Sequence, residues 1–98
     1  MYKIVKGSKE HMVIDVDDEL GELTTLETAG LQYSVKDRMG DDTSPPMNNL
    51  AGDAEDMQAR CLIDTTGLDV GQYRLFIKFN ALPEVPVLGP FLFQVSDD

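Results

Sequence analysis

A single cysteine and a single histidine are the residues of this sequence best suited to nucleophilic catalysis. They are Cys61 and His11. A thiolate nucleophile needs a base within hydrogen-bond reach and a third group that orients the base. The spacing of the two residues does not suggest such a pair. Cys61 lies in an apolar run, where a free thiol usually packs as a small hydrophobe. We therefore expect Cys61 in or near the core, and His11 on the outer face of a strand.

Acidic residues are the other groups whose chemistry needs testing. Zinc would require several Cys or His ligands, and the chain has two such residues in total. Calcium prefers carboxylates, and five lie close together: Asp15, Asp17, Asp18, Glu19 and Glu22. Counted from Asp15, the EF-hand positions for glycine and glutamate hold Leu20 and Leu26, so that motif is absent. A calcium site between loops and a solvated acidic turn both stay open, and we predict no metal and no cofactor.

No glycine-rich phosphate-binding loop occurs in the sequence. Pairs of carboxylates for acid–base catalysis can be drawn at will among eighteen acids, so they indicate nothing without a cleft. We predict that the protein is not an enzyme. The opposite outcome would require a cleft that brings His11 and Cys61, or several acids, together.

The net charge of −10 limits the classes of partner. Binding of nucleic acid or of an anionic membrane depends on basic residues, so we expect neither. A basic host protein and plain solubility by self-repulsion remain compatible with this charge. No apolar run reaches the roughly 20 residues of a membrane span. The first seven residues are too short and too polar for a signal peptide, so we expect no secretion by that route.

The length of 98 residues predicts one domain, residues 1–98. Apolar and polar residues alternate with a period of two, which predicts half-buried strands. The clearest segments are 12–16, 31–36, 73–79 and 91–95, and the weaker ones are 2–5, 23–26 and 59–64. Turn residues separate most of them. We predict an all-β protein, a single antiparallel β-sandwich of about seven strands.

Residues 40–58 interrupt this pattern. The stretch is acidic, contains Pro45 and Pro46, and lacks strand periodicity. We expect one long acidic loop, which is either lightly packed or in contact with a partner. Its apolar residues Met47, Leu50 and Met57 are the ones that could dock.

The most specific local motif runs from Asp69 through Gly71 to Tyr73. In immunoglobulin-like sandwiches, a tyrosine at the start of a late strand turns inward, and its hydroxyl hydrogen-bonds to the backbone at a corner. Glycine allows the tight backbone before it, and aspartate can accept local hydrogen bonds. Leu75 occupies the place of the usual disulfide cysteine. We therefore predict a structural corner at Asp69, Gly71 and Tyr73, with an ordinary turn and strand as the alternative.

The order of these segments resembles the small immunoglobulin-like β-sandwich domains of tailed-bacteriophage virion proteins, such as the N-terminal domains of siphophage baseplate upper proteins. The resemblance covers most of the chain and is best over Gly71–Ile77, although the tryptophan usual before that turn is absent. It implies a non-enzymatic structural or assembly module of the tail, baseplate, neck or head–tail region. Its partners would be other virion proteins or further copies of itself. It would be made in the host cytoplasm and reside in the virion.

Contact residues for such a module are apolar residues outside the expected core. Phe76 and Leu92 lie on the outward phase of their strands, with burial under residues 40–58 as the alternative. The other candidates are Val85, Val87, Met47 and Leu50.

A different class of function also stays open: an acidic inhibitor that mimics nucleic-acid charge and occupies a basic site on a host protein. Acids aligned on one face would favour this inhibitor.

Overall fold

The computed structural model describes residues 2–15, 30–55, 58–80 and 87–97. These residues form strands and no helix, and hence no helix that could cross a membrane. The eight strands are β1 (Tyr2–Val5), β2 (Lys9–Asp15), β3 (Leu31–Asp37), β4 (Asp42–Ala51), β5 (Asp53–Glu55), β6 (Gln58–Asp64), β7 (Gly71–Phe79) and β8 (Leu88–Ser96).

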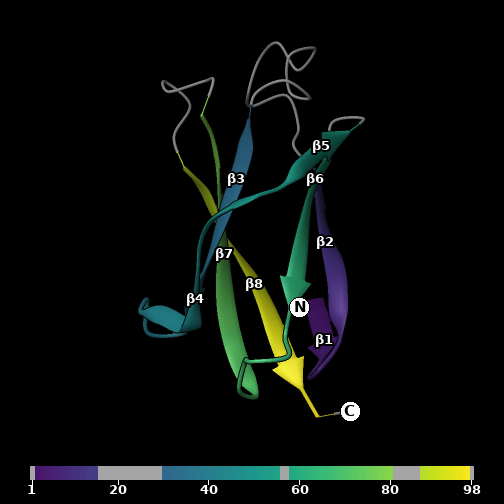
Figure 1. Ribbon diagram of the computed structural model, residues 1–98, viewed down its shortest axis with the longest axis vertical. Coiled ribbons are helices and arrows are strands. Elements are labelled where there is room, and N and C mark those ends of the chain that lie inside the picture. The colour runs from purple at the N-terminus through teal and green to yellow at the C-terminus, as the bar shows by residue number, and fades with distance from the viewer. Residues whose placement is uncertain (1, 16–29, 56–57, 81–86, 98) are drawn as a thin grey trace.

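The strands form two sheets that face each other as a sandwich (Figure 1). The larger sheet has the order β1-β8-β7-β3-β4, and the smaller one has the order β2-β6-β5. Every described pairing is antiparallel except that of β1 with β8, which is parallel. The prediction of an all-β sandwich is confirmed, with eight described strands where about seven were expected.

Period-two alternation explains which residues form the core, because successive side chains of a strand point to opposite faces. Along β7 each second residue from Tyr73 to Phe79 is buried. The predicted edge strand is β1, whose Ile4 is fully buried. The buried apolar residues are Ile4, Met12, Ile14, Leu31, Tyr33, Val35, Met47, Ala59, Cys61, Ile63, Leu68, Tyr73, Leu75, Ile77, Phe79, Phe93 and Val95. Residues 16 and 23–26, also expected in strands, lie outside the described residues.

The expectation of a long loop over residues 40–58 is wrong, because β4 and β5 occupy most of it. Two register shifts hide β4 from a periodicity search. Val35 pairs with Met47, but the next residue, Lys36, pairs with Asp42, so the intervening residues of β4 bulge out. The two prolines are tolerated because they lie in this bulge on an edge strand, between the paired residues Asp42 and Met47, where no described residue pairs with them.

The chain passes from the larger sheet to the smaller one at Gly52, between β4 and β5. The Gly52 N–H donates to the Leu31 carbonyl at 3.1 Å, which holds the crossing against β3. A Cβ atom at Gly52 would lie 2.3 Å from Leu31 Cδ2 and 3.2 Å from the Arg60 carbonyl oxygen. The crossing therefore leaves little space for a side chain, and a Cβ atom would force the end of Leu31 to move.

We predict that Gly52→Ala lowers the free energy of unfolding by about 1–3 kcal/mol, because the added methyl overpacks the crossing. Urea denaturation of the variant and the parent protein measures this difference. In a Leu31→Ala background the cost of Gly52→Ala should shrink, since the nearest clashing atom is gone. Equal costs in both backgrounds would contradict the steric explanation.

Candidate functional site

The predicted corner is present at the start of β7. The Tyr73 hydroxyl donates a hydrogen bond to the Asp69 carbonyl oxygen at 2.6 Å. The Tyr73 ring is buried and stacks on Phe93 of β8, with ring centroids 5.5 Å apart. Burial, together with the nearby charges of Asp69 and Asp37, raises the pKa of Tyr73. The hydroxyl therefore stays protonated and serves as a structural donor.

Cys61 and His11 lie on neighbouring strands but on opposite faces of the smaller sheet. The register pairs Met12 with Cys61 and His11 with Leu62. Cys61 is fully buried, whereas His11 is exposed, as expected from the sequence. Burial raises the pKa of the Cys61 thiol to about 12. In this arrangement the thiol is protonated at neutral pH and does not reach the imidazole.

The described acids do not gather into a metal-binding cluster. No group of three or more His, Cys, Asp or Glu residues within the described segments could hold a metal ion. Of the acids proposed for calcium, Asp15 is described, and it accepts a hydrogen bond from Gln58 at 3.0 Å. The other four lie outside the described residues. On the outer face of the smaller sheet, Asp15 and Asp64 share the surface with Lys9 and Arg60.

The outer side of the larger sheet, which we call the five-strand face, carries the two main candidate contact residues. Leu92 of β8 is 47% exposed. Phe76 of β7 is half-buried on the same side, and its ring lies close to Gly89 of β8. Val5 of β1 adds a third exposed apolar side chain. The outward phase predicted for Phe76 and Leu92 agrees with the burial pattern, while their role in binding stays a prediction.

A cross-strand row joins Leu92 to three charged residues on the five-strand face. Arg74 of β7 pairs with Leu92 on one side and with Lys36 of β3 on the other. Lys36 in turn pairs with Asp42 of β4, and its ammonium group donates hydrogen bonds to the Asp42 carboxylate and to Asn48. These contacts hold the pKa of Asp42 below its ordinary value. Arg74 forms no ion pair with any described residue.

The remaining candidate contacts lie elsewhere. Met47 is only 8% exposed and belongs to the core, so it presents little surface to a partner. Leu50 is partly buried against the same core. Val87 is 59% exposed just before β8, and Val85 lies outside the described residues. The structure therefore separates Met47 and Leu50 from Phe76 and Leu92, which share one face.

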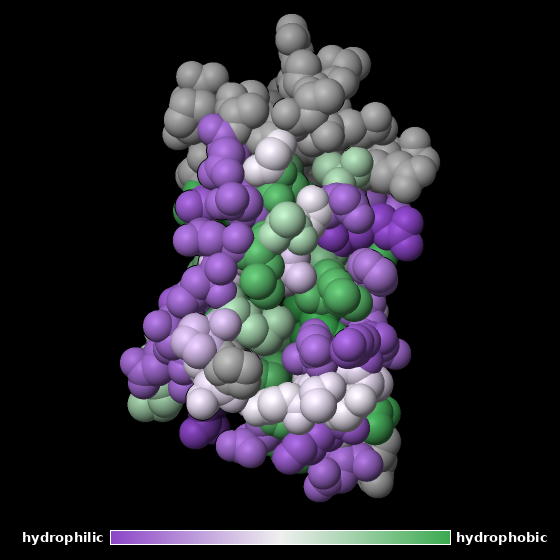
Figure 2. Space-filling model, in the orientation of Figure 1, coloured by the Kyte–Doolittle hydropathy of each residue, from purple (hydrophilic) through white to green (hydrophobic). Residues whose placement is uncertain are grey.

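Met47 and Leu50 line a groove of about 210 Å³ between the two sheets. The other lining residues are Pro46, Asp64, Gly67 and Leu68. Figure 2 shows hydrophobic surface along the middle of this side of the molecule, with hydrophilic residues on both flanks. The groove offers apolar contact and no converging polar groups.

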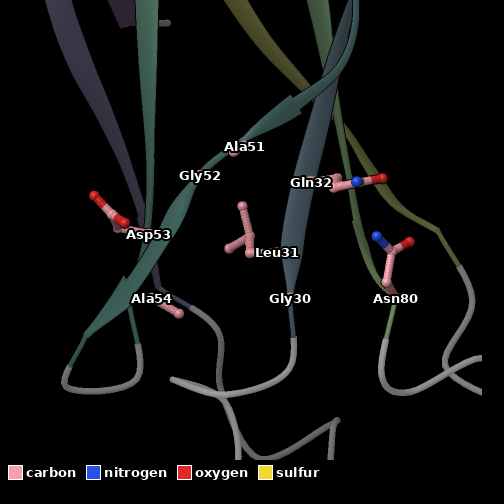
Figure 3. A pocket seen from close by; sticks show the side chains of 8 residues that line it. All are labelled: Gly30, Leu31, Gln32, Ala51, Gly52, Asp53, Ala54 and Asn80. Atoms are coloured by element: carbon pink, nitrogen blue, oxygen red, sulfur yellow. The ribbon is translucent and has the colours of Figure 1, made fainter.

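A second hollow, of about 320 Å³, lies beside the Gly52 crossing. Figure 3 shows that Leu31 lies in the angle below the crossing, whereas Asp53 points to the opposite side from Gln32 and Asn80. The polar groups therefore do not converge on a common point. This arrangement offers no set of groups for chemistry.

The charged row on the five-strand face was missed in the sequence. Arg74 and Lys36 are both outward on their strands, a signal that was available from the alternation. Their adjacency depends on the pairing of β3 with β7, two strands that are not consecutive in the chain.

Thr65 was also missed: its hydroxyl is fully buried, contacts the Val5 and Ser8 carbonyls, and accepts a hydrogen bond from the Gly7 N–H.

Comparison of the chain with protein-family models, with curated proteins and with solved structures found no match.

We predict that the protein loses stability as pH rises from about 9 toward about 12. Over this range the unfolded chain releases the Cys61 proton first, since the thiol pKa rises from 9.0 to about 12 on folding. Between these two pKa values, one such group lowers the free energy of unfolding by about 1.4 kcal/mol per pH unit. Urea midpoints measured at successive pH values test this, and Cys61→Ala should give a shallower fall. Identical slopes for the two proteins would contradict it.

We predict that Tyr73→Phe lowers the free energy of unfolding by about 1 kcal/mol, because it removes the hydrogen bond to Asp69 and keeps the buried ring. Tyr2→Phe is the matched control, since its hydroxyl donates to the His11 carbonyl at an exposed site. Tyr2→Phe should lower the free energy of unfolding by less than Tyr73→Phe does. Denaturation curves that place the two variants at the same midpoint would count against a corner role for Tyr73.

Proposed function

We propose that this chain is a non-enzymatic assembly module of a tailed-bacteriophage particle and that it acts through protein–protein contacts. The observation that carries the proposal is the row of Leu92, Arg74 and Lys36 on the five-strand face. It places an exposed apolar side chain beside two cations in a chain of net charge −10. Arginine and aromatic residues are enriched at protein interfaces, and Phe76 lies two residues from Arg74 on the same face.

The sandwich that presents this face is, in our proposal, immunoglobulin-like. Variable-type immunoglobulin domains place strands G, F, C and C′ in one sheet and B, E and D in the other. The orders β8-β7-β3-β4 and β2-β6-β5 agree with that arrangement when the strands from β2 to β8 are taken as B, C, C′, D, E, F and G. The hydrogen bond from Tyr73 to Asp69 at the start of β7 gives further support.

The phage assignment follows from the resemblance in layout to the immunoglobulin-like domains of virion proteins. Those domains dock onto other virion proteins or form rings around a symmetry axis. A sandwich of this kind works by contacts at a site on its surface. In this proposal the chain is made in the host cytoplasm and becomes part of the virion, where the five-strand face contacts a neighbouring protein.

We predict that phage particles contain this chain in several copies when they are purified on a density gradient from cells that produce it. Quantitative mass spectrometry of the particle fraction measures its copy number against the major head and tail proteins. An abundant host cytoplasmic protein serves as the control for carry-over. If the chain follows that control and leaves the particle fraction on washing, the proposal is wrong.

A further inference from the structure

The five-strand face collects half of the positive charge of an acidic protein. Of the eight Lys and Arg residues in the chain, four stand at outward positions of the larger sheet: Lys3, Lys36, Arg74 and Lys78. Within the described part of that face, strand register places one acid, Asp42, beside them. The face is therefore basic, whereas the chain as a whole has a net charge of −10.

The pairing of Arg74 with Lys36 is unfavourable within the isolated molecule, because like charges directly opposite each other on neighbouring strands repel. Asp42 and Asn48 satisfy Lys36. No described carboxylate lies within ion-pair distance of Arg74. A carboxylate brought by a partner would relieve this repulsion.

The surroundings of Arg74 suit such a carboxylate. A guanidinium group presents a planar fork of donors that binds a carboxylate in a bidentate manner. Leu92 lies opposite Arg74 on β8, and Phe76 is two residues along β7 on the same face. These apolar side chains would shield the ion pair from water once a partner covers them. The face thus fits a partner surface that carries both acids and exposed apolar residues.

One end of the same molecule has that composition. Met39, in the turn between β3 and β4, is 76% exposed, and Val70, just before β7, is 48% exposed. Both line a groove of about 340 Å³. The carboxylates of Asp41 and Asp69 belong to the same two connections, and both residues are exposed. Asp69 already lies 4.0 Å from the Lys6 ammonium group, and Arg38 also lines the groove, whereas Asp41 has no ion pair with any described residue. We call this surface the Met39/Val70 end.

We propose that the five-strand face of one molecule binds the Met39/Val70 end of a second copy, with Arg74 paired to a carboxylate of that end. The inference rests on the proposed assembly function and names its partner. A face-to-face dimer would oppose the cations of one copy to those of the other, whereas the face-to-end contact pairs opposite charges. Such a contact is heterologous, so repeated copies close into a ring or continue as a filament.

The contact can be tested by mixing two variants that each lack one half of it. Arg74→Glu reverses the charge that the five-strand face contributes to the contact, and the double variant Asp41→Lys/Asp69→Lys reverses the charge of the Met39/Val70 end. Sedimentation velocity at the highest soluble concentration should show oligomers of the parent protein and monomers of each variant. A mixture of the two variants should give a species with the mass of two chains, because one intact face meets one intact end. Each change should weaken self-association about tenfold or more.

Lys9→Glu, on the outer side of the smaller sheet, is the matched charge-reversal control and should associate like the parent protein. Urea midpoints of all variants confirm that each one is folded. A parent protein that stays monomeric, a variant mixture without the two-chain species, or a control that dissociates equally would overturn the inference. A monomer that is nevertheless found in purified particles would overturn this contact and leave the assembly function standing. If the chain forms oligomers but is absent from purified particles, this contact is supported and the assembly function is overturned.

Discussion

The corner at the start of β7, where the Tyr73 hydroxyl donates to the Asp69 carbonyl, is the local constraint nearest the centre of the larger sheet. It lies where β7 begins, and β7 is at the centre of that sheet between β8 and β3. A slip of one residue would move every side chain of β7 to the opposite face. The stack of Tyr73 on Phe93 holds the same register from the side of β8. The corner and this stack therefore fit the register that buries every second residue of β7 from Tyr73 to Phe79.

The two sheets are joined by further contacts that depend on this arrangement. Tyr33 of β3 is buried against the smaller sheet, and its hydroxyl donates to the Leu62 carbonyl of β6 at 2.5 Å. Thr65 ties the end of β6 to the turn between β1 and β2. Gly52 lets the chain cross between the sheets in direct contact with Leu31. With the core fixed in this way, Arg74 and Lys36 are left side by side on the outer surface. Asp42 pairs with Lys36, whereas Arg74 has no ion pair with a described residue, and we take Arg74 as the mark of a binding face.

Much of the fold could be predicted because alternation reports burial directly. β2, β3, β7 and β8 follow a period of two, and the corner motif is local in sequence. β4 could not be found this way, because its bulge between Asp42 and Met47 breaks the alternation. The charged row of the candidate site could not be found either, because it depends on which strands are neighbours in space. Periodicity within each strand carries no information on that pairing.

The most direct test of the central claim, that the register of β7 places Arg74 on the five-strand face, is a set of cross-strand nuclear Overhauser effects in solution. Backbone protons of Arg74 should show them to Leu92 on one side and to Lys36 on the other, as the register requires. The same spectrum should connect Tyr73 with Phe93. Effects that instead join Leu75 to Leu92 and to Lys36 would show a shifted register. Arg74 would then leave the five-strand face, and the contact surface proposed around it would not exist.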